Sequence, residues 1–288
     1  MAELSDWTCE YGGLVMGLPD SAISIVGVDG LLSLPEVRSS DLVLVQRDGL
    51  WPGDDYLNGR TVTLTLEIYG STREEFTAAL NALQAAFMPG QDERPFRFLF
   101  PGVAGDRAGY VNARVRRRSA PLDLNFAYLT CNMVIELFAT QPYIYADSPR
   151  TITARSYRRT VSPNGFVPPA VVPWNISTQG AQPVDPVTRF TQYGSFAARP
   201  FIIIENAASP VLIDDVTGLF FGVDYDGTLL VDCAAETVTN AAGTDMSGRI
   251  SVGSSWPEFA PGEHRLRLRS RDEYTAATAT LTWSDRWV

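Results

Sequence analysis

The residues from Thr61 to Tyr69 constrain the fold more than any other part of the chain. They alternate Thr or Glu with Val, Leu or Ile. Because successive side chains of a β-strand point to opposite faces of a sheet, this period of two indicates a strand with one face on a core. Shorter strand patterns begin at Ile23, before a predicted turn at Gly27–Gly30, and at Leu42. The N-terminal part is therefore predicted to contain a sheet with one covered face.

A single helix is predicted directly after that strand. Two overlapping Ser/Thr-x-x-Glu capping boxes lie between Ser71 and Glu75. Apolar residues then recur at helical spacing up to Phe87, and Pro89-Gly90 ends the pattern. One amphipathic helix among strands is typical of an α+β domain in which the helix packs on a sheet or split barrel.

The pattern after Pro200 is all-β, with short apolar runs separated by Asp-Gly and Pro-Gly turns, which predicts a β-sandwich. Its strands are expected at 201–205, 211–213, 219–221, 228–232, 249–252, 264–268 and 277–283. Residues 148–199 are rich in Pro, Ser, Thr, Gly and Gln and predict a linker with a few short strands. We therefore predict a mainly β protein with a domain at 1–147, this linker, and a sandwich at 200–288.

The charge of the chain argues against nucleic acid as a specific ligand. Its 33 Asp and Glu outnumber 23 Lys and Arg, for a net charge of −10, so the whole chain gains little from counterion release. A local exception is the cluster Arg114, Arg116, Arg117 and Arg118. It is interpreted either as a solvated or subunit-pairing face, or as a contact with an acidic partner.

Two targeting patterns are missing from the sequence. No apolar run approaches the ~20 residues that span a bilayer, so no membrane segment is expected. The first residues lack the basic and apolar regions of a secretory signal, so synthesis and folding in the cytoplasm are expected.

The usual residues of catalysis are also missing. The chain contains no HExxH, CxxC, Walker-type or GxGxxG motif, and its three cysteines are widely spaced, so neither a metal nor another cofactor is expected. His264 is the only histidine and follows a Pro-Gly turn, which predicts a solvent-facing residue at a turn or strand edge. The protein is therefore predicted not to be an enzyme.

Two groups of residues leave alternatives open. Asp224 and Asp226 could flank a sugar or hold a cation, but Asp before Gly is also ordinary hairpin-turn chemistry. Trp256 could stack on a sugar ring or belong to the sandwich core. Between the strands at 42 and 61, residues 41–58 form either a mobile surface loop or an arm that crosses to a neighbouring subunit. In the second case Trp51, Asp54 and Tyr56 are candidate interface residues.

A family resemblance emerges from the order of these features. Asp48-Gly49, then Tyr56 to Arg60 leading into the alternating strand, then Ile68 to Ser71 and the short helix, resemble the N-terminal domain of siphophage distal tail proteins. Phe96 to Pro101 and Gln141 to Tyr145 follow in the same order. In that family this belt domain forms a closed hexameric ring stacked on the tail tube.

The C-terminal part is similar to the galectin-like sandwich that often follows the belt. A strand ending at Asp232, the segment Ser254 to Gly262 and the terminal Leu281-Thr282-Trp283 carry this likeness. The resemblance implies a virion structural protein at the distal end of the tail. Its implied partners are five further copies, the tail tube protein and the tail-tip hub, with DNA passing through the ring.

Two other functions stay open at this point. The sandwich could serve as an adhesin for host-surface glycan, with Asp224, Asp226 and Trp256 as contacts. Less favoured is a virion glycosidase that uses Asp224 or Asp226, because glycosidases need only two carboxylates at a suitable separation.

Overall fold

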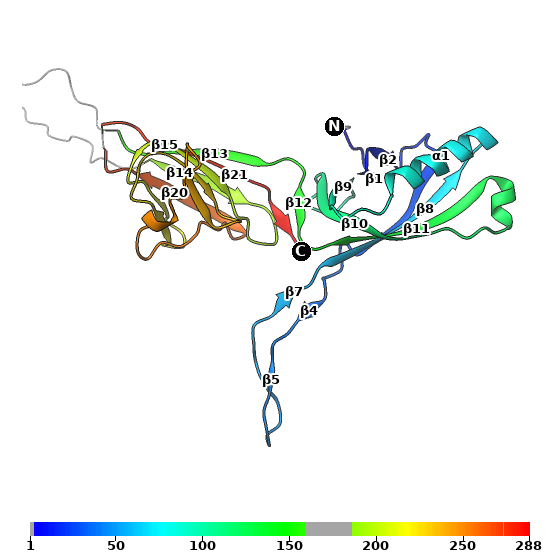
Figure 1. The fold of residues 1–288 in the computed structure, drawn as a ribbon, viewed down its shortest axis with the longest axis horizontal. Coiled ribbons are helices and arrows are strands. Elements are labelled where there is room, and N and C mark those ends of the chain that lie inside the picture. Colours follow the sequence, from blue (N-terminus) through cyan, green and yellow to red (C-terminus); the bar gives the residue numbers. More distant parts are fainter. Residues whose placement is uncertain (1–2, 159–185, 273) are drawn as a thin grey trace, which may run out of the picture. The chain divides into compact units, whose positions relative to one another are not determined.

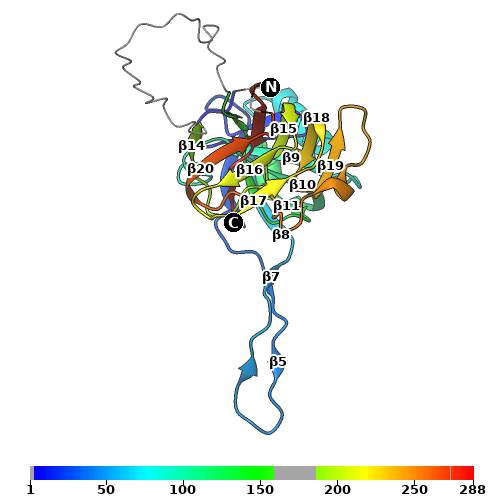
Figure 2. The ribbon, with the colours of Figure 1, turned by 90° about the vertical axis from the view of Figure 1, so that its left-hand side faces the viewer.

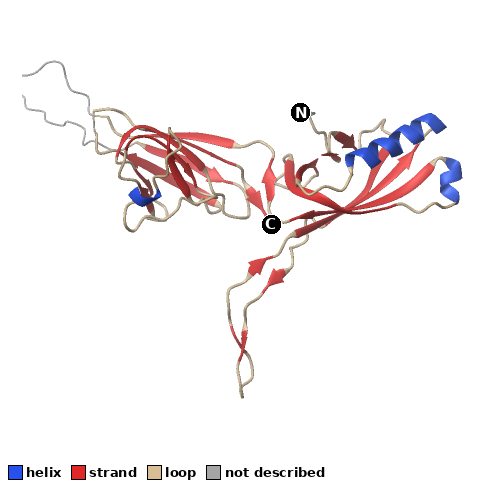
Figure 3. Cartoon of the chain, in the orientation of Figure 1, coloured by secondary structure: helices blue, strands red, loops and turns tan. Residues whose placement is uncertain are grey.

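The computed structural model describes residues 3–158, 186–272 and 274–288 and divides them into two compact units. Unit 1 is Met1–Ser148 together with Arg286–Val288, and unit 2 is Pro149–Asp285. Strands make up most of the regular structure in both (Figures 1 and 3). The expected mainly β fold is confirmed.

Unit 1 is built on one hydrogen-bonded sheet with a helix across it. The path through the sheet is β2-β1-β9-β10-β11-β8-β3, with β12 attached to β10 and β22 attached to β12. The strands are β1 Thr8–Tyr11, β2 Leu14–Met16, β3 Ile23–Asp29, β8 Arg60–Tyr69, β9 Arg94–Leu99, β10 Gly109–Ser119, β11 Thr130–Ala139, β12 Ile144–Ala146 and β22 Arg286–Trp287.

The alternating run forms the central strand β8, as predicted. It pairs with β11 along its whole length, from Arg60 opposite Ala139 to Tyr69 opposite Thr130. Its apolar residues are fully buried, whereas the threonines between them are partly or fully exposed. The period of two in the sequence therefore corresponds to one core face and one open face.

Helix α1, Arg73–Ala86, covers the core face of the sheet. Thr72 is the N-cap, and its hydroxyl accepts a hydrogen bond from the backbone N–H of Glu75 at 3.2 Å. The Glu75 carboxylate reaches back to the backbone N–H of Ser71 at 2.9 Å. Of the two overlapping capping boxes, the one beginning at Thr72 thus caps the helix.

The predicted turn at Gly27–Gly30 is wrong. Strand β3 continues to Asp29 through a β-bulge between Ile25 and Gly27, which absorbs the extra residue without ending the pairing with β8. The chain turns only at Gly30, whose φ is +89°. A Cβ there would lie 2.0 Å from the carbonyl oxygen of Thr61, so only glycine fits.

A buried arginine fixes the point where the chain leaves and re-enters this sheet. Arg60 is 1% exposed, and its Nε donates to the carbonyl of Pro142 at 2.7 Å. Its Nη1 donates to three carbonyls just beyond β3, those of Gly30, Leu31 and Ser33. Burial lowers the pKa of Arg60. One side chain therefore ties together both ends of the excursion 31–59 and the connection between β11 and β12.

A second charged cluster joins β1, β9 and the end of unit 1. The guanidinium of Arg97 donates to Asp147 through Nε at 2.8 Å and Nη2 at 2.6 Å, and to Glu10 through Nη1 at 2.6 Å. These hydrogen bonds from Arg97 hold the pKa of Asp147 below its usual value. The bidentate pair anchors the chain where it passes into unit 2.

Unit 2 is a β-sandwich, as predicted, with a core shared by two sheets (Figure 2). One sheet has the order β13-β21-β15-β18-β19 and the other β14-β20-β16-β17. The strands are β13 Arg150–Arg155, β14 Val187–Gln192, β15 Phe201–Ala208, β16 Val211–Asp214, β17 Phe220–Gly222, β18 Asp226–Asp232, β19 Thr237–Asn240, β20 Gly262–Arg269 and β21 Thr278–Trp283.

Two boundaries differ from the predicted ones. Strands β13 and β14 belong to the sandwich, so the described parts of 148–199 are not a separate linker; residues 159–185 lie outside the described residues. The final pair Arg286–Trp287 belongs to unit 1, because β22 pairs with β12 and Trp287 packs against the core of that unit. Unit 2 is thus inserted between two strands of unit 1.

The strand expected at 249–252 is also missing. A short 3-10 turn, Ser247–Arg249, occupies this place, and Ile250 makes a single bridge to Val223. Gly253, with φ +83°, then turns the chain away, so the pairing ends after one residue.

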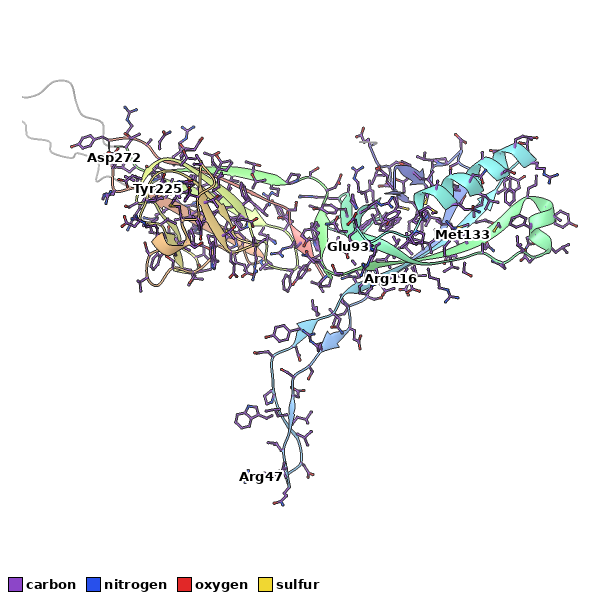
Figure 4. The ribbon with its side chains drawn as sticks, viewed as in Figure 1. Arg47, Glu93, Arg116, Met133, Tyr225 and Asp272 are labelled. Atoms are coloured by element: carbon purple, nitrogen blue, oxygen red, sulfur yellow. The ribbon has the colours of Figure 1, made fainter. Side chains whose placement is uncertain are left out.

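We predict that Arg60→Met destabilises unit 1 by about 3 kcal/mol, because buried carbonyls lose their donor. Urea unfolding followed by fluorescence measures this. Arg47→Met, at the exposed tip of the same excursion (Figure 4), should change the free energy of unfolding by less than about 0.5 kcal/mol. Equal stability of the two variants would contradict a clamping role for Arg60.

We also predict a pH-dependent cost for Asp147→Asn. The folded-state pKa of Asp147 is lowered from 3.8, so its contribution to stability is complete above that value and is lost as pH falls through the folded pKa. At neutral pH the substitution should cost roughly 1.5–3 kcal/mol, and the cost should shrink below pH 3.8. Urea unfolding of both proteins across pH tests this, and a cost that does not change with pH would refute it.

Candidate assembly interface

One part of the unit 1 sheet consists of four strands, β10, β11, β8 and β3, and has two open edges. Within it, β11 and β8 are central, β3 is one edge, and the second half of β10, Arg114–Ser119, is the other. Along β10, the pairing with β9 covers only the first half, Gly109–Ala113. Among the described strands, none pairs with the outer side of β3 or of Arg114–Ser119. Such unpaired backbone is a template for another chain.

The face of this sheet that turns away from α1 is polar. Residues with partly or fully exposed side chains alternate with the buried ones along β8 and β11. They are Thr61, Thr63, Thr65, Glu67 and Tyr69 on β8, and Asn132, Val134, Glu136 and Phe138 on β11. The four-stranded sheet therefore has one apolar face, covered within unit 1, and one face suited to water.

Between β3 and β8 the chain forms a projecting ribbon, which we call the arm (residues 36–57; Figure 1). Strand β4 Val37–Arg38 pairs with β7 Tyr56–Leu57, and β5 Leu42–Val43 pairs with β6 Leu50–Trp51. Trp51 is 65% exposed and Tyr56 is 54% exposed. A two-stranded ribbon without a core is marginally stable alone, so exposed apolar residues along it indicate a partner surface.

The three candidate interface residues all lie on the arm. Asp54 and Tyr56 are exposed like Trp51, and the carbonyl of Asp54 accepts a hydrogen bond from the Ser40 hydroxyl at 2.8 Å across the ribbon. The guanidinium of Arg38 lies 5.8 Å from the Tyr56 ring centre. Contact of these residues with a neighbouring subunit stays a prediction.

The candidate glycan contacts of unit 2 are not brought together in one pocket. Asp224 accepts a hydrogen bond from the Ser209 hydroxyl at 2.7 Å. The two carboxylate oxygens of Asp226 accept hydrogen bonds from Arg271 Nη2 at 2.8 and 2.9 Å. Trp256 packs on Phe221 at 5.0 Å and lines a cavity of about 30 Å³, to which neither aspartate contributes. Their role as sugar contacts stays a prediction.

His264 is not the solvent-facing residue that the sequence predicts. It is 3% exposed, because it lies on the core face of β20 with Leu266 and Leu268, where Phe190 and Phe259 pack against its ring. Its Nδ1 lies 2.8 Å from the Asp214 carboxylate and its Nε2 lies 2.7 Å from the carbonyl of Ala260. Both partners are acceptors, so each ring nitrogen lies next to a group that can accept a hydrogen bond. The ring thereby ties β16 and the segment before β20 to the core.

A signal in the sequence could have placed His264 correctly. Leu266 and Leu268 follow it at intervals of two, so the same alternation that buries them also buries the histidine. The preceding Pro-Gly turn, taken alone, predicts an exposed histidine instead.

The three cysteines are buried and unpaired. Burial raises the pKa of Cys9 and of Cys233 to about 12, which keeps these thiols protonated. In the described ranges, no three His, Cys, Asp or Glu side chains are grouped so that they could hold a metal ion. None of the helices described has the length and apolar character needed to cross a membrane.

Solved structures of phage tail components resemble the chain. The SPP1 Dit (gp 19.1) protein, described as a paradigm of the hub adsorption apparatus in phages that infect Gram-positive bacteria, matches with a TM-score of 0.65 and 14% identity, over 98% of this chain and 99% of that chain. The phage P2 baseplate in its activated conformation matches with TM-scores of 0.42 with Ca and 0.43 with Sr. The identities are 10% and 11%, over 93% and 96% of both chains. Neither a protein-family model nor a curated protein matches the chain.

The first comparison shows that the chain has the fold of SPP1 Dit over nearly its whole length. The two baseplate scores are too low to argue a shared fold. The fold implied by the resemblance to distal tail proteins is thereby confirmed, at an identity that establishes the fold alone.

We predict that His264→Phe, which keeps an aromatic ring beside Phe190, destabilises unit 2 by roughly 2–3 kcal/mol because Asp214 and Ala260 lose a donor. Glu263→Gln, on the exposed side of the same strand, is the control and should leave the free energy of unfolding nearly unchanged. Urea unfolding of the two variants measures the free energy of unfolding, and equal stability of the two would contradict this role of His264.

Proposed function

We propose that this protein is a structural subunit of a bacteriophage tail, a ring that connects the tail tube to the tail tip. The observation that carries the proposal is the match to SPP1 Dit over 98% of this chain and 99% of that chain. A match of this extent includes both units, so it supports a common architecture rather than one shared domain.

The geometry of unit 1 supports a ring. The open edges at β3 and at Arg114–Ser119 lie on opposite sides of one sheet and differ from each other. Pairing one edge with the other edge of the next copy is a heterologous contact, and such contacts close into a ring when the rotation permits. The arm adds a second contact surface. We propose six copies, in accordance with the family resemblance.

The polar face of the same sheet suits the wall of a channel. Glu136 stands on it opposite Arg117, and Glu67 lies on the same face further along β8, so the face carries both signs of charge. An acidic channel wall, which the net charge of the chain would favour, therefore has little support here. The partners that we propose are the tail tube protein above the ring and the tail-tip hub below it.

We propose that this role is structural and not enzymatic, and that it is performed in the virion. The residues that a hydrolase would need are engaged elsewhere: His264 by Asp214 and Ala260, and Asp226 by Arg271. Synthesis and assembly in the host cytoplasm are part of the same proposal.

Mass photometry over a concentration series, followed by negative-stain imaging, tests the ring. We expect a species of about six times the 31.6 kDa subunit mass, with a central hole. Trp51→Ala with Tyr56→Ala should lower the ring fraction without unfolding the chain, because both side chains are exposed in the subunit. Val252→Ala, at a fully exposed site in unit 2, should leave assembly unchanged. A chain that stays monomeric at every concentration would contradict the proposal.

A further inference from the structure

We infer that the arm of one copy docks on an arginine strip of the neighbouring copy. The strip is Arg114, Arg116 and Arg117, on the open edge of β10. This inference rests on the proposed ring and goes further by naming the surface that receives the arm.

A β-bulge creates the strip. The pairing of β10 with β11 shifts between Val115 and Arg117, so Arg116 is an extra residue. Its guanidinium lies 5.0 Å from the ring centre of Phe138, on the polar face, while Arg117 pairs with Glu136 of the same face. Arg118 instead donates to the carbonyl of Gln84 in α1. The bulge thus gathers the other arginines toward the open face.

The arginines of the strip form no ion pair with the residues that the structure describes in the same subunit. Arg116 and Arg117 are exposed, and neither forms an ion pair with any residue that the structure describes. Arg114 is half-buried, its Nε is buried without a hydrogen-bond partner, and its Nη1 makes one long contact with the carbonyl of Gln91 at 3.5 Å. Three neighbouring guanidinium groups on a sheet edge favour an acidic partner.

The arm has the complementary chemistry. Between residues 41 and 55 it carries four aspartates against one arginine, and all five are exposed. Trp51 and Tyr56 add exposed aromatic rings, which stack favourably on guanidinium groups. Within one subunit the arm points away from the strip: Figure 4 shows Arg47 at the far tip of the arm and Arg116 back on the sheet. In the proposed ring, a second copy is the partner that brings an arm to the strip.

The register of the strands places the two surfaces at the same end of the sheet. Asp29, where β3 ends before the arm, pairs with Thr63 of β8. Phe138 pairs with Thr61 on one side and with Arg114 on the other. The root of the arm and the strip therefore lie at one end of the sheet, on opposite edges. When the β3 edge of one copy meets the β10 edge of the next, the arm of the first leaves the junction beside the strip of the second.

Charge exchange tests the contact. Arg116→Glu with Arg117→Glu, and separately Asp54→Arg with Asp55→Arg, should each raise the subunit concentration at half assembly by about tenfold at low salt. The chain with all four substitutions should regain assembly, because the opposite charges face each other again. Added salt should reduce the differences in the concentration at half assembly between the charge variants and the unmodified chain, because it screens the exposed charges.

Matched controls separate this contact from a general effect of charge. Arg155→Glu with Arg265→Glu makes the same change of charge at exposed sites in unit 2 and should leave assembly unchanged. Urea unfolding of each variant should match that of the unmodified chain, because the changed side chains are exposed.

Each other outcome overturns the inference in a distinct way. Rings that form equally well from every variant would remove the arm–strip contact and leave the ring proposal intact. Loss of assembly that the fourfold exchange does not restore would assign the strip to another partner. Duplex DNA binding that is lost in the strip variant, with assembly unchanged, would assign the strip to phosphate. An unmodified chain that never assembles would overturn the ring and this contact together.

Discussion

The buried guanidinium of Arg60 is the interaction on which the rest of unit 1 depends. It sits at the first residue of the central strand and holds carbonyls from the two segments that flank that strand in space. Carbonyl dipoles, rather than a carboxylate, stabilise its charge, so the bond directions are set by backbone geometry. The arm can therefore project without a core of its own, since its two ends are fixed where they leave the sheet.

A sheet with open edges presents an aggregation hazard as well as an opportunity for assembly. In unit 1 the β10 edge carries consecutive arginines, which repel a second copy of the same edge. A symmetric pairing of two β10 edges is therefore disfavoured, whereas pairing of the β10 edge with the β3 edge of another copy is not. The same residues that favour an acidic partner thus also exclude one wrong arrangement.

The sequence predicted elements whose pattern is local and missed features that depend on distant residues. The period of two in β8 and the capping box at Thr72 identify their elements because both rules act within a few residues. The surroundings of His264 come from residues distant in the chain, such as Phe190 and Asp214, and the return of Trp287 to unit 1 depends on a partner far back in the chain. Turn residues mark the segment that holds Trp51, Asp54 and Tyr56, whose contact with a neighbour stays a prediction, whereas nothing local marks Arg60 as an arginine that binds carbonyls.

The insertion of unit 2 between β12 and β22 has a consequence for the order of folding. Strand β22 completes the pairing of β12 and brings Trp287 onto the first core, yet the ribosome makes it only after all of Pro149–Asp285. Most of unit 1 emerges early, but its sheet closes late. A chain interrupted anywhere in unit 2 would lack that last strand, so the sheet of unit 1 is complete only in a chain whose whole insertion has been translated.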